Sequence, residues 1–273
     1  MKKKNCKIIA EIGWNHMGNI ALAKKMIIAA KKSGADFAKF QTWSVKTLKP
    51  GPWDHDGRTK IYKNAELSFK KHKLLIKFCK KNKISFLTSI FNHKDVEWIK
   101  KLNLKIIKIP SPEINNIKLL KEVNGVFKEI IVSTGAATWT EIKKVKKIIT
   151  KSKITFLHCV SSYPAREENI NLPRINKLKE IHKSIGYSGH LPGISDAIAS
   201  LNYGVEYIEK HFTTDNKLPG RDNKFALLPH QLKYLVDYKN QFSQMNIYKG
   251  KNFQKVELDM RKFYRGRWSK NYV

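Results

Sequence analysis

Two kinds of segment alternate along most of the chain. Short runs of consecutive apolar residues, rich in Val, Ile and Phe, are each followed by a longer segment with the apolar periodicity of an amphipathic helix. Runs without polar alternation are typical of strands that are buried on both faces of a parallel sheet. They predict strands at residues 7–12, 37–41, 85–88, 104–109, 129–133, 153–160, 185–188 and 205–211.

Helices are expected between these strands. Gly34 is placed to end the first helix, and Thr138 with Glu141 three residues later forms the capping box that starts another. A long polar loop, which contains Pro50 and Gly51, separates the second strand from its helix. The expected helices are 21–32, 68–81, 94–101, 117–123, one after Thr138, 175–181, 194–202 and 229–241.

This order of elements predicts an α/β fold, a (β/α)₈ TIM barrel formed as a single domain by residues 1–241. A doubly wound open sheet is the competing architecture, and it usually carries G-x-G-x-x-G directly after its first strand. The chain has Glu11-Ile12-Gly13-Trp14-Asn15-His16 at that place, so the barrel is favoured. Residues 242–273 are expected to form a basic and aromatic tail.

The charge and the cysteine content indicate which partners and which cellular compartment to expect. Lys+Arg number 54 and Asp+Glu 22, a net charge of +32 that would suit nucleic acid, an anionic membrane or an anionic substrate. Because the lysines are spread over nearly every expected helix, we expect neither a nucleic-acid partner nor a membrane partner. The 3 cysteines have no C-x-x-C spacing, and no apolar run approaches the ~20 residues of a membrane span. A cytoplasmic protein with reduced thiols is therefore expected.

Polar residues gather where the expected strands end, at the rim of a barrel that carries active sites. One such residue is usually just a solvated strand end, but a ring of them indicates a site. Lys39 and Lys108 interrupt apolar strands, where a charge must be paired or bind an anion. The hydroxyls of Ser111, Ser133 and Ser188 would help to hold a phosphate and a carboxylate.

The same rim offers metal ligands and acid–base groups. His190 and His211 end adjacent strands, close enough to bind one transition-metal ion such as Mn, Fe, Co or Zn. Glu11 and Glu113 are candidate general acids or bases, or carboxylates that anchor a substrate.

Several motifs resemble the sialic acid synthase (N-acetylneuraminate synthase) family, in order from about residue 7 to 240. They are Ala10-Glu11-Ile12-Gly13-x-Asn15-His16-x-Gly18, Lys39-Phe40-Gln41, Glu66-Leu67-Ser68, Ser133-Thr134-Gly135, His158-Cys159-Val160-Ser161-Ser162-Tyr163-Pro164, Gly186-Tyr187-Ser188-x-His190 and Ile208-Glu209-Lys210-His211-Phe212-Thr213. The resemblance implies a barrel enzyme that condenses phosphoenolpyruvate with the open-chain aldehyde of an N-acylated hexosamine. The products would be a nonulosonic acid and phosphate.

The resemblance also implies roles for individual residues. A divalent metal, typically Mn²⁺ with Mg²⁺ or Co²⁺ as alternatives, would be bound by His190 and His211 and would polarise the aldehyde. The sugar and the attacking water would be positioned by Glu11, Gln41, Glu113 and Asp222. Phosphoenolpyruvate would be held by Lys39, Lys108, Ser111, Ser133, Ser161 and Ser188, with Ser89 and Tyr163 nearby.

The chain departs from the family pattern mainly around the sugar side. Gly189 stands where the family usually has Asp, which is expected to loosen the support of the metal site. Other departures are Ser89-Ile90-Phe91, Pro110-Ser111-Pro112-Glu113 and Gly220-Arg221-Asp222.

Typical members continue into a small antifreeze-like domain that supplies an arginine to the partner's sugar site across a dimer. That domain is not expected here. We expect a possible homodimer, in which Arg265 or Arg267 of the tail could replace the missing arginine.

Two other functions stay open from the sequence. One is a related synthase of the octulosonate-phosphate type, which also consists of a barrel alone and uses a phosphorylated sugar. The other is a degenerate basic barrel that binds polyanions, although the retained histidines and strand lysines argue against it.

Overall fold

The computed structural model describes residues 6–52 and 54–268. The basic residues 1–5 and the last five residues of the expected tail lie outside this part of the chain. The chain divides into two compact units, Met1–Lys239 and Asn240–Val273.

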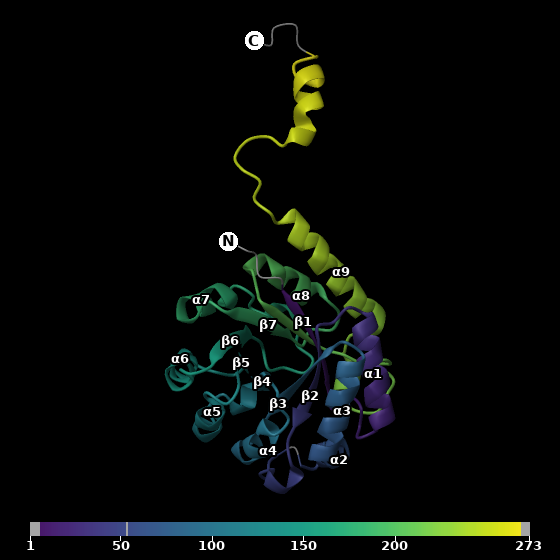
Figure 1. The fold of residues 1–273 in the computed structure, drawn as a ribbon, viewed down its shortest axis with the longest axis vertical. Helices are drawn as coiled ribbons and strands as arrows, with labels where there is room; N and C mark the ends of the chain where they lie inside the picture. Colours follow the sequence, from purple (N-terminus) through teal and green to yellow (C-terminus); the bar gives the residue numbers. More distant parts are fainter. Residues whose placement is uncertain (1–5, 53, 269–273) are drawn as a thin grey trace. The chain divides into compact units, whose positions relative to one another are not determined.

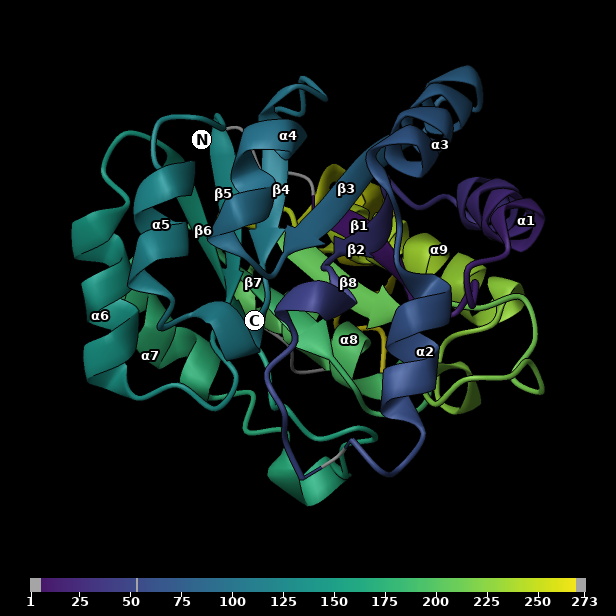
Figure 2. The ribbon, with the colours of Figure 1, turned by 90° about the horizontal axis from the view of Figure 1, so that it is seen from below.

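The first unit contains a closed barrel of parallel strands, which confirms the predicted fold class (Figures 1 and 2). Each strand pairs with the next along the chain, and the last pairs with the first. The strands are β1 (Lys7–Gly13), β2 (Phe37–Thr42), β3 (Ser85–Ile90), β4 (Ile106–Ile109), β5 (Glu129–Ser133), β6 (Lys153–His158), β7 (Ile185–Gly189) and β8 (Tyr207–His211).

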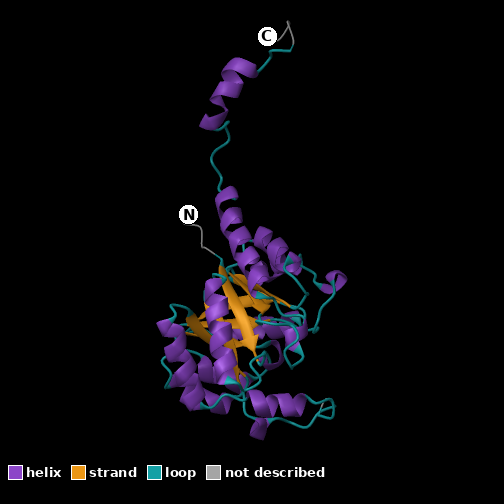
Figure 3. Ribbon diagram, turned by 90° about the vertical axis from the view of Figure 1, so that its right-hand side faces the viewer, coloured by secondary structure: helices purple, strands orange, loops and turns teal. Residues whose placement is uncertain are grey.

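Helices surround these strands (Figure 3). Local signals set their ends: the Thr138 and Glu141 capping box is formed, and Gly34 follows the first helix with a φ of 87°. The helices are α1 (Ile20–Lys32), α2 (Arg58–Ala65), α3 (Phe69–Lys81), α4 (Val96–Lys100), α5 (Ile117–Val123), α6 (Trp139–Ile148), α7 (Arg174–Ile181), α8 (Ser195–Ser200) and α9 (Pro229–Met245).

The sequence-based boundaries are wrong in a few places. The fourth and eighth strands begin two residues later than expected, and the sixth ends at His158. Helix α2 lies in the segment expected to be a loop. Only Ala65 of this helix is buried, so it lacks the apolar face by which the other helices were recognised.

The barrel interior is layered. An apolar layer fills the end where the strands begin, and it consists of Ile9, Phe37, Leu87, Ile131, Leu157 and Tyr207. Side chains two residues apart in a strand point to the same face. The next inward residues are therefore two positions further along each strand, and they include Glu11, Lys39, Ser89, Ser133, Cys159 and Glu209. The strands thus place a polar layer directly above the apolar one.

The second unit contains the end of α9, a short 3₁₀ turn (Lys255–Glu257) and a π-helical turn (Met260–Tyr264). Within it, the Arg267 guanidinium lies 5.7 Å from the ring centre of Tyr264. Among the described residues, no helix combines the length and the apolar character needed to span a membrane.

Candidate functional site

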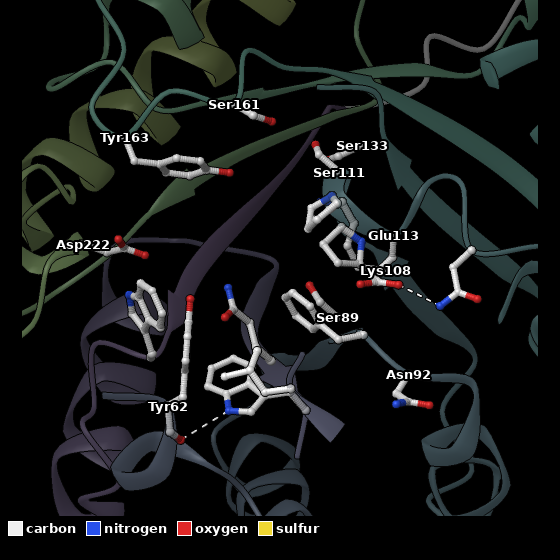
Figure 4. Close-up of a pocket in the computed structure, with 18 of the residues that line it drawn as sticks. Tyr62, Ser89, Asn92, Lys108, Ser111, Glu113, Ser133, Ser161, Tyr163 and Asp222 are labelled. Carbon is white, nitrogen blue, oxygen red and sulfur yellow. Dashed lines mark hydrogen bonds between the residues drawn. The ribbon is translucent and has the colours of Figure 1, made fainter. Parts of the chain in front are cut away.

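A cavity of about 1260 Å³ opens at the carboxyl end of the strands. The residues expected from the sequence to form a site all line it, with the exception of Glu11 (Figure 4). They are Lys39, Gln41, Ser89, Lys108, Ser111, Glu113, Ser133, Ser161, Tyr163, Ser188, His190, His211 and Asp222. These side chains come from β2 to β8 or from the loops after those strands, and Trp14 from the loop after β1 lines the same cavity.

Glu11 lies below the cavity surface, where it is 1% exposed. Its carboxylate is 2.7 Å from the Lys39 ammonium and accepts a hydrogen bond of 2.6 Å from the Gln41 amide. The register of the strands causes this contact, because Glu11 is the partner of Lys39 on β2 and of His211 on β8. Glu11 thus contacts Lys39 and Gln41 from below and does not line the cavity.

Glu209 is a site residue that the sequence analysis did not select. Its carboxylate is 3.0 Å from Lys108 Nζ and 3.6 Å from Lys39 Nζ, and it accepts a hydrogen bond from the Ser188 hydroxyl. The available signal was its place two residues before His211 in β8, which puts both side chains on the inner face of the barrel. Two ammonium groups and two carboxylates consequently neutralise each other in the polar layer.

The electrostatics of this layer follow from burial and pairing. Burial alone would raise the pKa of Glu209, but the Lys108 and Lys39 ammonium groups lower it to about 2. Burial raises the pKa of Glu11, against the effect of Lys39. Burial also lowers the pKa of Lys108. An incoming anion would find both lysines held in the cavity floor by carboxylates.

Hydroxyl groups cluster where β5 and β6 end. The Gly135 amide donates to Ser111 Oγ at 3.2 Å, and Ser133 Oγ is buried without a hydrogen-bond partner. A Cβ at Gly135 would lie 2.2 Å from Ser161 Oγ and 2.6 Å from Cys159 Sγ, so only glycine lets these groups approach the backbone. Figure 4 shows Ser111, Ser133 and Ser161 on the same side of the cavity, opposite Tyr62 and Asn92.

The two histidines lie side by side, as their positions on adjacent strands predict. Their ring centres are 5.4 Å apart, and the Tyr163 ring lies 4.2 Å from that of His190. Burial lowers the pKa of His190 to about 4. Burial and the neighbouring His190 lower the pKa of His211 well below its usual value. Both imidazoles are therefore neutral at pH 7, the form that binds metal ions.

The hydrogen bonds of the pair suit metal ligands. His190 Nδ1 lies 2.7 Å from the Val160 carbonyl, which fixes the proton on Nδ1 and leaves the Nε2 lone pair available. His211 Nδ1 is buried without a hydrogen bond, 3.3 Å from the Asp222 carboxylate. Within residues 6–52 and 54–268, no group of three or more His, Cys, Asp or Glu side chains is arranged to hold a metal ion. The two imidazoles are therefore the candidate ligands at this place, and oxygen ligands from outside the chain would have to complete the coordination of a metal.

The outer wall of the cavity is aromatic, a feature that the sequence analysis missed. The ring of Trp14 lies 5.2 Å from Tyr62 and 6.2 Å from Trp43, and Trp43 lies 5.7 Å from Phe91. Trp43 and Tyr62 come from the segment that was expected to be a polar loop, and Tyr62 belongs to α2. The cavity therefore combines a charged floor with a wall suited to the apolar parts of a ligand.

The remaining predicted carboxylates belong to loops after the strands. Glu113 follows β4 and accepts a hydrogen bond of 2.7 Å from Asn116. Asp222 lies beside His211, and its neighbour Arg221 donates to Asp56 at 2.8 Å. Glu113 and Asp222 are therefore separate groups on different loops of the rim (Figure 4).

Comparison with known proteins agrees with the barrel fold. The chain is 40% identical to the N,N'-diacetyllegionaminic acid synthase of Campylobacter jejuni, over 85% of this chain and 75% of that protein. It is 35% identical to the enzyme of the same name from Legionella pneumophila, over 85% and 70%. The structure of the N-acetylneuraminic acid (sialic acid) synthetase of Leptospira borgpetersenii superposes with a TM-score of 0.86 and 32% identity, covering 95% of this chain and 93% of that one. A model described as the NeuB family matches residues 26–251. The chain therefore belongs to the NeuB family.

Proposed function

We propose that this protein condenses phosphoenolpyruvate with the open-chain aldehyde of an N-acylated hexosamine, giving a nonulosonic acid and phosphate. One observation carries the proposal: two buried lysines and a group of serine hydroxyls share a cavity floor with a pair of neutral histidines. The names of the relatives, which are synthases of nonulosonic acids, support the same reaction class.

Phosphoenolpyruvate carries a phosphate and a carboxylate, and the floor offers complementary groups for both. Lys39 and Lys108 supply the positive charge, and their ion pairs with Glu11 and Glu209 hold the two ammonium groups in place before the ligand arrives. The hydroxyls of Ser111, Ser133, Ser161 and Ser188, with Ser89 and Tyr163, supply hydrogen bonds.

The reaction requires one new carbon–carbon bond. C3 of phosphoenolpyruvate attacks the aldehyde carbon, and the aldehyde oxygen takes up a proton. Water then adds at C2 and loses one proton. The C2–O bond to phosphate breaks with its electron pair leaving on the phosphate, and the new C2 hydroxyl passes its proton to that phosphate as the 2-keto group forms. A divalent metal at His190 and His211 would supply Lewis acidity toward the aldehyde oxygen.

The other residues position the second substrate. The sugar lies between the histidine pair and the aromatic wall, where Gln41, Glu113 and Asp222 offer polar contacts. Glu11 holds Gln41 and Lys39 from below, and so acts on both substrates through them.

We also propose the physiological setting. Mn²⁺ is the metal that the family resemblance implies, and two imidazoles completed by oxygen ligands from substrate and water are compatible with a transition metal. A cytoplasmic location fits the three free, buried cysteines and the use of phosphoenolpyruvate. The homodimer expected from the family resemblance stays a proposal.

The test is phosphate release from phosphoenolpyruvate with a panel of N-acylated hexoses, each with and without Mn²⁺ after chelator treatment. We expect release that depends on both the sugar and the metal. A pentose phosphate in the same panel tests the octulosonate-phosphate alternative. No release with any sugar would overturn the proposal.

A further inference from the structure

A buried polar network centred on Asp196 lies next to the histidine pair but outside the cavity lining. Asp196 belongs to α8, and its carboxylate pairs with Lys210 of β8. Lys210 alternates with Glu209 and His211, so it points to the opposite face of the strand, toward the helices. The network is thus separated from the cavity by the strands that carry the histidines.

The network holds the backbone on either side of both histidines. Lys210 immediately precedes His211, and its ammonium donates to Asp196 Oδ1 at 2.9 Å. The same ammonium donates at 2.6 Å to the carbonyl of Leu191, the residue directly after His190. One side chain therefore connects the chain next to one histidine with the chain next to the other.

Asp196 is fully engaged in this arrangement. Its Oδ2 accepts from the Tyr187 hydroxyl at 2.8 Å, and its Oδ1 accepts from the Ala197 amide at 2.8 Å. The Asp196 side chain is completely buried, and that of Lys210 is 2% exposed. Such a pair has no solvent to replace a lost partner, so its geometry is fixed.

Gly189 makes room for the carboxylate. It is paired in register with Lys210, and a Cβ on Gly189 would lie 2.2 Å from Asp196 Oδ2. A side chain at position 189 and the carboxylate of Asp196 therefore exclude each other. The expectation that glycine at this position loosens the support of the metal site stays a prediction, and the structure adds that a carboxylate from α8 occupies the space beside Gly189.

We propose that Asp196 is a positioning residue, which orients His190 and His211 through Lys210 and the Leu191 carbonyl. Its carboxylate takes the place of a side chain at position 189. The inference rests on the proposed metal-dependent function, because the histidine pair has to be held at one spacing to bind a single ion. A buried ion pair that serves stability alone can often be replaced by apolar residues at little cost. Replacement of a pair that sets geometry should instead weaken binding at the residues that the pair positions.

The test measures Mn²⁺ affinity of the full chain by electron paramagnetic resonance of free Mn²⁺, alongside thermal unfolding. In Asp196→Ala/Lys210→Met both charges are removed together, which avoids an unpaired buried charge. We expect a folded protein whose Mn²⁺ affinity is about 10–100-fold weaker, the range for lost outer partners of metal ligands. Unchanged Mn²⁺ affinity in the folded variant overturns the proposal.

Two further variants keep the question decidable. Asp196→Asn preserves the volume of the side chain and decides the question if the double variant does not fold. Weakened Mn²⁺ binding in Asp196→Asn supports the proposal. Unchanged Mn²⁺ binding in Asp196→Asn contradicts it. Gly189→Asp/Asp196→Ala moves the carboxylate to the other side of the same space. Affinity above that of Asp196→Ala alone supports the proposal, and affinity no better than that counts against it.

A matched control separates positioning from general loss of stability. Glu129 is a carboxylate at the opposite end of the barrel, where it accepts hydrogen bonds from Lys153, Thr155 and Tyr207. Glu129→Gln should lower the unfolding temperature without changing the Mn²⁺ affinity. His190→Ala tests the metal site itself: if it leaves Mn²⁺ binding intact, the proposed metal site fails, a result distinct from a failure of Asp196 alone.

Discussion

The Lys108 ammonium lies 3.0 Å from the Glu209 carboxylate, and both side chains are buried in the polar layer of the barrel. Both also line the floor of the cavity, where an incoming anion can reach Lys108. Their pairing connects stability to the binding of an anion, because Lys108 is also a predicted ligand of phosphoenolpyruvate.

Glu209→Gln should destabilise the protein by about 3–5 kcal/mol at pH 7, since it leaves a buried ammonium without its carboxylate. The pKa of Glu209 is lowered to about 2, so its stabilising effect is complete above its unfolded-state value near 4.3 and is lost as the pH falls toward 2. Urea unfolding at pH 3, 5 and 7 measures this. The loss of stability between pH 5 and 3 should be smaller in the variant than in the wild type, and equal losses would contradict the assignment.

Gly135→Ala should raise the KM for phosphoenolpyruvate by about tenfold, equivalent to 1.4 kcal/mol. The added methyl would lie 2.2 Å from Ser161 Oγ and 2.9 Å from Ser111 Oγ, and it would push the hydroxyls apart. Gly51→Ala is the matched control, because no atom lies within 4 Å of its new methyl. Steady-state kinetics with varied phosphoenolpyruvate measure both KM values. Equal KM values in the two variants would argue against binding of phosphoenolpyruvate by these serine hydroxyls.

His190→Ala and His211→Ala should each abolish measurable Mn²⁺ binding and sugar-dependent phosphate release. Because the pKa of His190 is about 4, protons should not compete with the metal between pH 7 and pH 5.5. Isothermal titration with Mn²⁺ at several pH values tests both points. His182→Ala is the control, since that histidine does not line the cavity. A tenfold loss of wild-type affinity at pH 5.5 would contradict the neutral pair.

Trp43→Leu should raise the KM for the sugar by about tenfold and leave the KM for phosphoenolpyruvate unchanged, because Trp43 belongs to the aromatic wall. Trp139→Leu, which alters an aromatic side chain outside the cavity lining, should change neither constant. Kinetics with each substrate varied in turn separate the two effects. A rise in the KM for phosphoenolpyruvate alone would mean that the wall belongs to the other substrate.

The barrel and most of the candidate site could be predicted from the sequence because both depend on the same pattern of apolar runs. Continuous apolar runs identify buried parallel strands, and Lys39 and Lys108 are conspicuous as charges within such runs. Glu209 was passed over because it belongs to a charged stretch, Glu209-Lys210-His211, whose members cannot be divided between two faces until the strand is placed. No pattern in the sequence singled out Asp196, because the role proposed for it depends on the space beside Gly189, which only the structure reveals.

Helix α2 and the aromatic wall were missed for a different reason. The sequence Arg58-Thr59-Lys60-Ile61-Tyr62-Lys63-Asn64-Ala65 has no apolar stripe, because this helix covers the cavity and does not pack on the barrel. Its Tyr62 instead meets Trp14 from the loop after β1, a contact between positions 48 residues apart. Hydrophobic periodicity identifies helices that pack an apolar face against a core. It cannot identify a helix that faces a ligand cavity instead.

The apolar layer beneath the polar one has an evolutionary consequence. Ile9, Phe37, Leu87, Ile131, Leu157 and Tyr207 hold the strands together without touching the cavity. Substitutions above that layer can alter which sugar is accepted while the framework beneath keeps its shape. Proteins with this architecture can therefore change the sugar that they accept without compensating mutations in the apolar layer.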